Sequence, residues 1–202
     1  MRSVKSPSGS LRAERAAVTR RRIAEAARGL FATRGYGATT LREIAAAAGV
    51  AVQTVYAVFG SKANILRELR EGLVTDPAAD AAFRAALDAS SPPAALDLFA
   101  RSVRLRWETG HDIVAIHLEA GSTDPTIRVE VEAVLSARRR GIGRLAGSVA
   151  GLEPSLDVRE VMAVLDGLTL PEIYAELVGV HGWSAEAYES WLAEALRRLV
   201  LR

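Results

Sequence analysis

The sequence predicts an all-α protein of about nine helices, with short helices near the N-terminus and longer ones forming a bundle after them. Two observations lead to this fold class. Ala, Leu, Arg and Glu dominate, while β-branched residues other than Val and aromatic residues are sparse, a composition that favours helix over strand. Apolar residues also recur every three or four positions between Gly- and Pro-containing turn signals, as on the buried faces of amphipathic helices.

Residues 1–18 read as a flexible basic arm, because they open with Ser, Pro and Gly and show no apolar periodicity. The basic residues Arg2, Lys5, Arg12 and Arg15 could insert into the minor groove of a nucleic acid, or the segment could be a solvated tail. A transit peptide has a similar composition. The first helix is expected from Thr19, and Gly35 supplies a left-handed stop. Its apolar face consists of Ile23, Ala27, Leu30 and Phe31.

Three short helices follow in quick succession. Thr40 and Glu43 have the spacing of a capping box, which predicts that a second helix starts at Thr40. Gly49 ends it, and a third helix runs from about Ala51 to Gly60. Ser61 is a suitable N-cap for a fourth helix that buries Ile65 and Leu66.

Beyond about Asp76 the chain reads as longer helices separated by turn signals. These include the Ser and Pro residues at 90–93, Gly110, residues 121–125, residues 151–154 and residues 182–184. The last two helices are expected over about Val158–Val180 and Ser184–Leu201. The final helix carries an uninterrupted apolar stripe made of Tyr188, Trp191, Leu192, Ala195, Leu196, Leu199 and Val200.

Charge is distributed unevenly along the chain. Residues 1–75 hold 13 Lys and Arg against 5 Asp and Glu, a net charge of +8, whereas residues 76–202 hold 13 against 19, a net charge of −6. A basic N-terminal part favours a polyanionic partner, because neutralised phosphates release their counterions. The sequence has no Cys and no apolar run long enough to span a bilayer, so a cytoplasmic protein with no membrane partner is expected.

The spacing of three residues between positions 40 and 62 predicts a helix-turn-helix. Ala45 is small where two helices cross, Gly49 tolerates the turn four positions later, and Val55 is an apolar anchor six positions further on. The same three residues would also suit the core and turn of an ordinary helical bundle.

In a helix-turn-helix the second helix enters the major groove of double-stranded DNA. Gln53 could pair with adenine, and Val52, Thr54 and Ala57 could contact thymine methyl groups. The side chains better suited to phosphates are Thr40, Tyr56, Lys62 and the arginines that open the first helix, Arg20 and Arg21.

The run IAEAARGLFATRGYGATTLREIAAAAGVAVQTVYAVFGSKANIL resembles the DNA-binding segment of TetR (tetracycline repressor) family regulators. The motifs that carry the resemblance are Phe31, Gly35, Thr40, Ile44-Ala45, Ala48-Gly49-Val50, Thr54, Tyr56, Phe59 and Ser61-Lys62. The resemblance implies a DNA-binding domain over residues 19–66 and a ligand-sensing and dimerisation domain over residues 67–202. The chain departs from the family pattern at Ala51, where Ser is usual, and in its third helix, which is uncharged.

By the same resemblance, the two C-terminal helices should pair with their copies in a homodimer that binds a palindromic operator. The interface would use Tyr188, Trp191, Leu192, Ala195, Leu196 and Leu199, although a monomer's own core could absorb the same stripe. The middle helices should hold a small-molecule effector that releases a repressor from DNA. The expected pocket residues, which could equally be plain core, are Phe99, Val103, Trp107, His111, Ile116, His117, Met162, Leu165 and Tyr174.

An enzyme is not expected from this sequence. His111 and His117 lie six residues apart, so they do not share a helix face as a His-x-x-x-His metal site requires. No nucleophile elbow, P-loop or dinucleotide fingerprint is present, so neither catalytic residues nor a cofactor or metal is expected. An all-helical enzyme with scattered catalytic residues, and a helical scaffold that no longer binds DNA, remain the alternatives.

Overall fold

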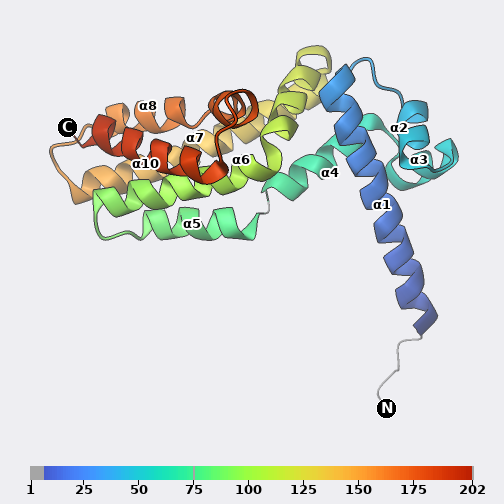
Figure 1. Cartoon of the computed structure of the whole chain (residues 1–202), viewed down its shortest axis with the longest axis horizontal. Coiled ribbons are helices and arrows are strands. Elements are labelled where there is room, and N and C mark those ends of the chain that lie inside the picture. Colours follow the sequence, from blue (N-terminus) through green and yellow to red (C-terminus); the bar gives the residue numbers. More distant parts are fainter. Residues whose placement is uncertain (1–6, 75, 202) are drawn as a thin grey trace. The chain divides into compact units, whose positions relative to one another are not determined.

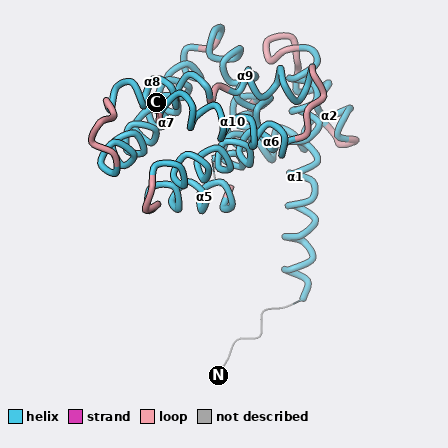
Figure 2. The backbone as a smooth tube through the Cα atoms, turned by 60° about the vertical axis from the view of Figure 1, so that its left-hand side comes forward, coloured by secondary structure: helices cyan, strands magenta, loops and turns pink. Residues whose placement is uncertain are grey.

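A computed structural model describes residues 7–74 and 76–201, and all regular secondary structure in those two ranges is helical (Figure 2). These residues form ten α-helices and one π-helical turn, as the all-α prediction requires. The chain divides into two compact units, one up to Glu71 and the other from Gly72 onward. The division falls inside a helix, whereas the sequence placed the domain boundary after Leu66.

The first unit contains four helices (Figure 1): α1 (Pro7–Arg34), α2 (Leu41–Ala48), α3 (Val52–Phe59) and most of α4 (Lys62–Val74). Buried apolar side chains from all four helices form its core, namely Ile23, Ala27, Phe31, Ile44, Ala45, Val55, Phe59, Ile65 and Leu66. Phe31 and Tyr36 add a tilted ring contact with centroids 5.2 Å apart. Burial of these side chains is what fixes such short helices, which would be marginal in isolation.

The expected irregular arm over residues 1–18 is wrong for residues 7–18, because α1 begins at Pro7 rather than near Thr19. Residues 1–6 lie outside the described residues. Proline suits the first turn of a helix, and the Ala-, Arg- and Glu-rich segment after it has high helix propensity. Periodicity could not reveal this part of the helix, because residues 11–18 are exposed and need no apolar face.

The second unit consists of α5 (Pro77–Leu87), α6 (Pro92–Thr123), α7 (Pro125–Leu152), α8 (Val158–Leu168), α9 (Pro171–Tyr174), a π-helical turn η1 (Ala175–Val180) and α10 (Ala185–Val200). α6 packs against α5, α7 and α10, and α8 packs against α7 and α10 (Figure 1). The N-caps Asp76, Asp124, Asp157 and Ser184 each accept hydrogen bonds from backbone N–H groups of the helix that follows.

Two expected element boundaries in this unit are wrong. Gly110 is not a turn but a buried residue inside α6, where tertiary packing outweighs its low helix propensity. The single helix expected over Val158–Val180 is interrupted after Leu168 and restarts at Pro171. Proline disfavours helical backbone in the residue before it, and Leu170 is accordingly extended, with φ −70° and ψ 142°.

Among the described residues no single helix is both long and apolar enough to cross a membrane. In the part of the chain that the structure describes, only α2 and α3 taken together meet those criteria, and that pair is bent by 107°.

Candidate nucleic-acid interface

The turn between α2 and α3 sets the relative direction of two helices in the first unit. Their axes differ by 107°, within the range of about 90–120° that helix-turn-helix motifs use. Gly49 adopts φ 63° and ψ 40°, the left-handed conformation that residues with a side chain rarely adopt. Ala45 and Val55 are 1% and 0% exposed, so the crossing point and the anchor are both inside the core.

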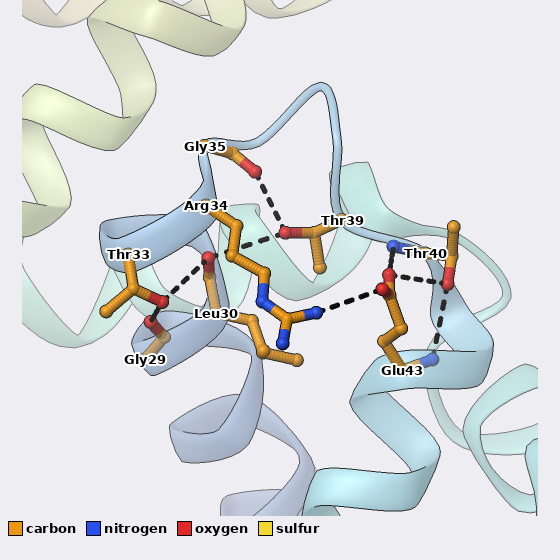
Figure 3. Close-up of polar contacts among 8 residues, drawn as sticks. All are labelled: Gly29, Leu30, Thr33, Arg34, Gly35, Thr39, Thr40 and Glu43. Carbon is orange, nitrogen blue, oxygen red and sulfur yellow. Dashed lines mark hydrogen bonds and ion pairs between the residues drawn. The ribbon is translucent and has the colours of Figure 1, made fainter.

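The start of α2 is held by a complete capping box (Figure 3). The Thr40 hydroxyl accepts from the Glu43 backbone N–H at 3.2 Å, and the Glu43 carboxylate accepts from the Thr40 backbone N–H at 2.8 Å. The hydroxyl also donates to that carboxylate, and Arg34 pairs with it from α1 at 3.1 Å. The backbone hydrogen bond, the hydroxyl and the guanidinium lower the pKa of Glu43. The cap therefore occupies the hydroxyl proton that the predicted phosphate contact of Thr40 would need.

α3 presents its neutral outer face to solvent. Gln53 and Ala57 are exposed, Val52 and Thr54 are half-buried, and Tyr56 is 56% exposed. The opposite face, Val55 and Phe59, is buried. Ala51, at the N-cap, makes no side-chain hydrogen bond, so the first turn of α3 is not capped from that position. Five predicted DNA-contacting side chains therefore lie on one helix, with at least part of each at the surface.

Two of the predicted phosphate ligands hold the first unit together. Arg20 forms an ion pair with Glu68 of α4, donates to the Val58 carbonyl of α3 at 3.2 Å, and lies 4.6 Å over the Phe59 ring. The Lys62 ammonium donates to the Tyr36 carbonyl at 2.6 Å and lies 4.5 Å over the ring of the same residue. By contrast, Arg21 is exposed and has no hydrogen-bond or ion-pair partner among the described residues.

Sequence reasoning missed the role of Arg22. Its guanidinium donates to the Ala48 carbonyl at 2.6 Å, satisfying the C-terminus of α2 immediately before the turn. A Cβ atom at Gly49 would lie only 3.0 Å from the same guanidinium. No local pattern announces a contact that joins residues 26 positions apart.

In the second unit, most of the predicted pocket residues gather in one packed core. Phe99, Val103, Trp107, Leu165 and Tyr174 are buried together, with Met162 at the margin. His111 lies beside Tyr174 with ring centroids 5.2 Å apart, and its Nδ1 is 2.9 Å from the Trp107 carbonyl. Ile116 and His117 are also buried but lie further along α6, outside that core cluster.

A groove of about 480 Å³ lies elsewhere, between α7 and α8. It is lined by Glu132, Leu135, Ser136, Arg139, Arg140, Gly143 and Met162, so Met162 alone among the predicted pocket residues contributes to it.

The environment of Tyr188 in the second unit was not predicted from the sequence. Its ring is completely buried, 4.9 Å from the Tyr174 ring, and burial raises the pKa of its phenol. Its hydroxyl makes no hydrogen bond to any described residue. An unsatisfied buried hydroxyl typically costs about 1–3 kcal/mol.

Half of the predicted dimer stripe lies inside the chain's own core. Tyr188, Leu192 and Leu196 are each 0% exposed, so their assignment to an interface between chains is wrong. The physical reason is that α10 packs on α6 and α8, which absorb the central line of the stripe. Trp191 and Ala195 are half-buried, and Leu199 is 39% exposed.

Comparison with known proteins bears on both units. Residues 23–69 match the family model described as "Bacterial regulatory proteins, tetR family". A search of curated protein sequences finds no match. The matched segment spans the helix-turn-helix and most of α4.

Solved structures of regulators share the fold over nearly the whole chain. The ketosteroid transcriptional regulator KstR2 of Mycobacterium tuberculosis has 23% identity and a TM-score of 0.68, with 90% of this chain and 94% of that one covered. NalD, the secondary repressor of the MexAB-OprM multidrug efflux pump in Pseudomonas aeruginosa, has 23% identity and a TM-score of 0.68, with 93% and 98% covered. FadR from Bacillus subtilis, solved in complex with stearoyl-CoA, has 19% identity and a TM-score of 0.65, with 87% and 96% covered.

At these identities the solved structures establish the fold of the chain. The matched family model and the three solved structures named above are those of regulatory proteins. Over residues 23–69 the chain carries a domain that matches the tetR family of bacterial regulatory proteins.

Proposed function

We propose that this DNA-binding regulator reads its target sequence with the outer face of α3. The observation that carries the proposal is the exposed, uncharged surface around Gln53 and Tyr56, on a helix turned 107° from α2 in a part of the chain with net charge +8. An uncharged reading helix contributes no electrostatic attraction of its own. Affinity then comes from the arginines around it, and sequence preference from the helix.

The roles of individual side chains follow from their exposure. Gln53 can make a bidentate pair with adenine, while Val52, Thr54 and Ala57 contact thymine methyl groups. Tyr56 and Arg21 contact phosphates. Thr40, Arg20 and Lys62 act mainly by fixing α2, α1 and α4 in place, since their polar groups already bond within the unit.

We also propose that the protein forms a homodimer that binds a palindromic operator. The surface of α10 that its own core leaves uncovered includes Leu199, Ala195 and Trp191, and α8 adds the exposed small residues Ala163 and Gly167. Small residues on two adjacent helices allow close packing against a second copy. A twofold axis would place two copies of α3 one DNA turn apart, about 34 Å.

We further propose that the regulator is a cytoplasmic repressor released from DNA by a small molecule. NalD is named as a repressor, and the Bacillus subtilis FadR structure contains stearoyl-CoA. Ligand binding among the α6 and α8 side chains of the second unit would favour one arrangement of the dimer over another and so shift the population away from the DNA-bound state.

The test begins with selection of bound duplexes from a random-sequence library. Binding of the enriched duplex and of a mixed-sequence duplex is then measured by fluorescence anisotropy for wild type, Gln53→Ala and Thr33→Ala. Thr33 is an exposed neutral residue on α1 whose hydroxyl bonds only to its own helix, so it serves as the matched control.

Gln53→Ala should lose about tenfold or more on the enriched duplex, because a bidentate base contact discriminates by about 1–3 kcal/mol. It should change little on the mixed-sequence duplex, and Thr33→Ala should change neither. An equal loss on both duplexes would remove the reading role of Gln53. Failure of wild type to bind either duplex at low salt would remove the proposed function.

A further inference from the structure

Residues 11–18 of α1 do not contribute to the core of the first unit. α1 is one unbroken helix from Pro7 to Arg34, yet residues 11–18 are all exposed, including Leu11 at 56% and Val18 at 46%. Figure 1 shows this half of the helix passing beyond α2 and α3, with no other helix of the first unit beside it. A protein gains no core stability from an exposed helical extension, which points to a contact outside the chain.

The chemistry of the extension suits a polyanion. Arg12 and Arg15 are exposed and make no hydrogen bond or ion pair through their side chains with any residue that the structure describes. They lie three positions apart and therefore on the same side of the helix. Glu14 is the only acidic residue between Leu11 and Arg22.

The extension is also continuous with the candidate DNA interface. Arg20, on the same helix, donates to the Val58 carbonyl near the C-terminal end of α3, and Arg21 next to it is exposed. Nine residues of helix separate Leu11 from Arg20, a rise of about 14 Å at 1.5 Å per residue. That length matches the rise of about four base pairs of duplex.

We propose that residues 11–18 of α1 form a second DNA-contacting surface, in which Arg12 and Arg15 bind backbone phosphates of the duplex that flanks the sequence read by α3. This inference rests on the proposed function. Because the segment is an extension of a packed helix, its backbone is already ordered before binding, which reduces the entropy that a disordered arm would lose on DNA. Its contacts are to phosphates and are independent of the flanking sequence.

The test uses the full chain with Arg12→Gln and Arg15→Gln combined, since Gln removes both charges and keeps a high helix propensity. The matched control is Arg101→Gln combined with Arg144→Gln, which removes two exposed charges of α6 and α7 that have no partner among the described residues. Circular dichroism checks that helix content is retained. Binding is measured from 50 to 300 mM salt on two duplexes. The shorter one is the library-selected duplex trimmed to the segment that the bound protein protects, and the longer one carries six further base pairs on each side of that segment.

On the longer duplex the slope of log affinity against log salt should become shallower by about 2 per protomer for the Arg12/Arg15 variant, since each phosphate contact contributes about 0.9. Wild type and the control should gain affinity from the added flanks, and the Arg12/Arg15 variant should gain none. An unchanged slope, or an equal gain from the flanks, would overturn the inference while leaving the reading role of α3 intact. Loss of wild-type binding to both duplexes would instead refute the proposed function and this inference together.

Discussion

The turn glycine offers the sharpest prediction about how the reading helix is positioned. Gly49→Ala adds one methyl group at a residue with φ +63°, and that methyl would lie 3.0 Å from the Arg22 guanidinium. Arg22 in turn holds the Ala48 carbonyl at the end of α2. The substitution therefore strains the backbone of the turn and displaces the side chain that caps the preceding helix.

Three contributions set the loss of stability expected for Gly49→Ala. A left-handed conformation costs a residue with a side chain about 1–2 kcal/mol. Weakening the bond from the Arg22 guanidinium removes up to about 1.5 kcal/mol, and the reduced freedom of the unfolded chain returns about 0.4–1 kcal/mol. We expect Gly49→Ala to destabilise the first unit by about 2 kcal/mol.

Hydrogen exchange read by mass spectrometry measures this effect locally, through the opening free energies of peptides from α2 and α3. Gly29→Ala is the matched control, because Gly29 is an exposed residue in α1 with no atom within 4 Å of an added Cβ. That control should be stabilising by about 0.5–1 kcal/mol, since alanine is the better helix former. If both substitutions stabilised the unit, the strain and the Arg22 contact inferred here would be wrong.

Three further predictions concern other parts of the chain. Tyr188→Phe should stabilise the protein by about 1 kcal/mol, because it removes a buried hydroxyl that has no partner among the described residues. Urea unfolding followed by tryptophan fluorescence should show a higher midpoint, and a lower midpoint would show that the hydroxyl is hydrogen-bonded. The pKa of Glu43 in the folded protein, followed by NMR, should lie below its ordinary value. The capping box therefore stabilises the fold above the unfolded-state pKa of about 4.3, and this stabilisation is lost as the pH falls through the folded-state pKa. Thr40→Ala should raise the pKa of Glu43, and an unchanged pKa would contradict the role of the cap. Leu199→Glu should shift sedimentation from dimer to monomer while leaving helix content unchanged, and a persistent dimer would place the interface elsewhere.

The sequence predicted the first unit best where local chemistry decides the structure. A capping box, a glycine in the left-handed region and buried apolar spacing all act within a few residues, and the ends of α2 and α3 follow from them. The start of α1 could not be found in the same way. An exposed helix has no apolar face, so its only signal is propensity, and that signal is weak beside the Ser, Pro and Gly of the first ten residues.

Long-range pairing explains the remaining differences. Arg20 and Lys62 looked like free cations in the sequence, but they bond to residues 38 and 26 positions away. The apolar stripe of α10 was visible, yet periodicity cannot say whether a stripe faces the chain's own core or a second copy. The structure divides it, burying Tyr188 and Leu192 and leaving Leu199 at the surface.

Hydrogen exchange of the full chain with and without the enriched duplex tests the central claim most directly, because it reports where DNA touches the protein without any substitution. We predict new protection at residues 52–58 of α3, with added protection at the N-terminal part of α1 on a longer duplex. Protection confined to the second unit, with α3 exchanging at the same rate in both samples, would contradict it.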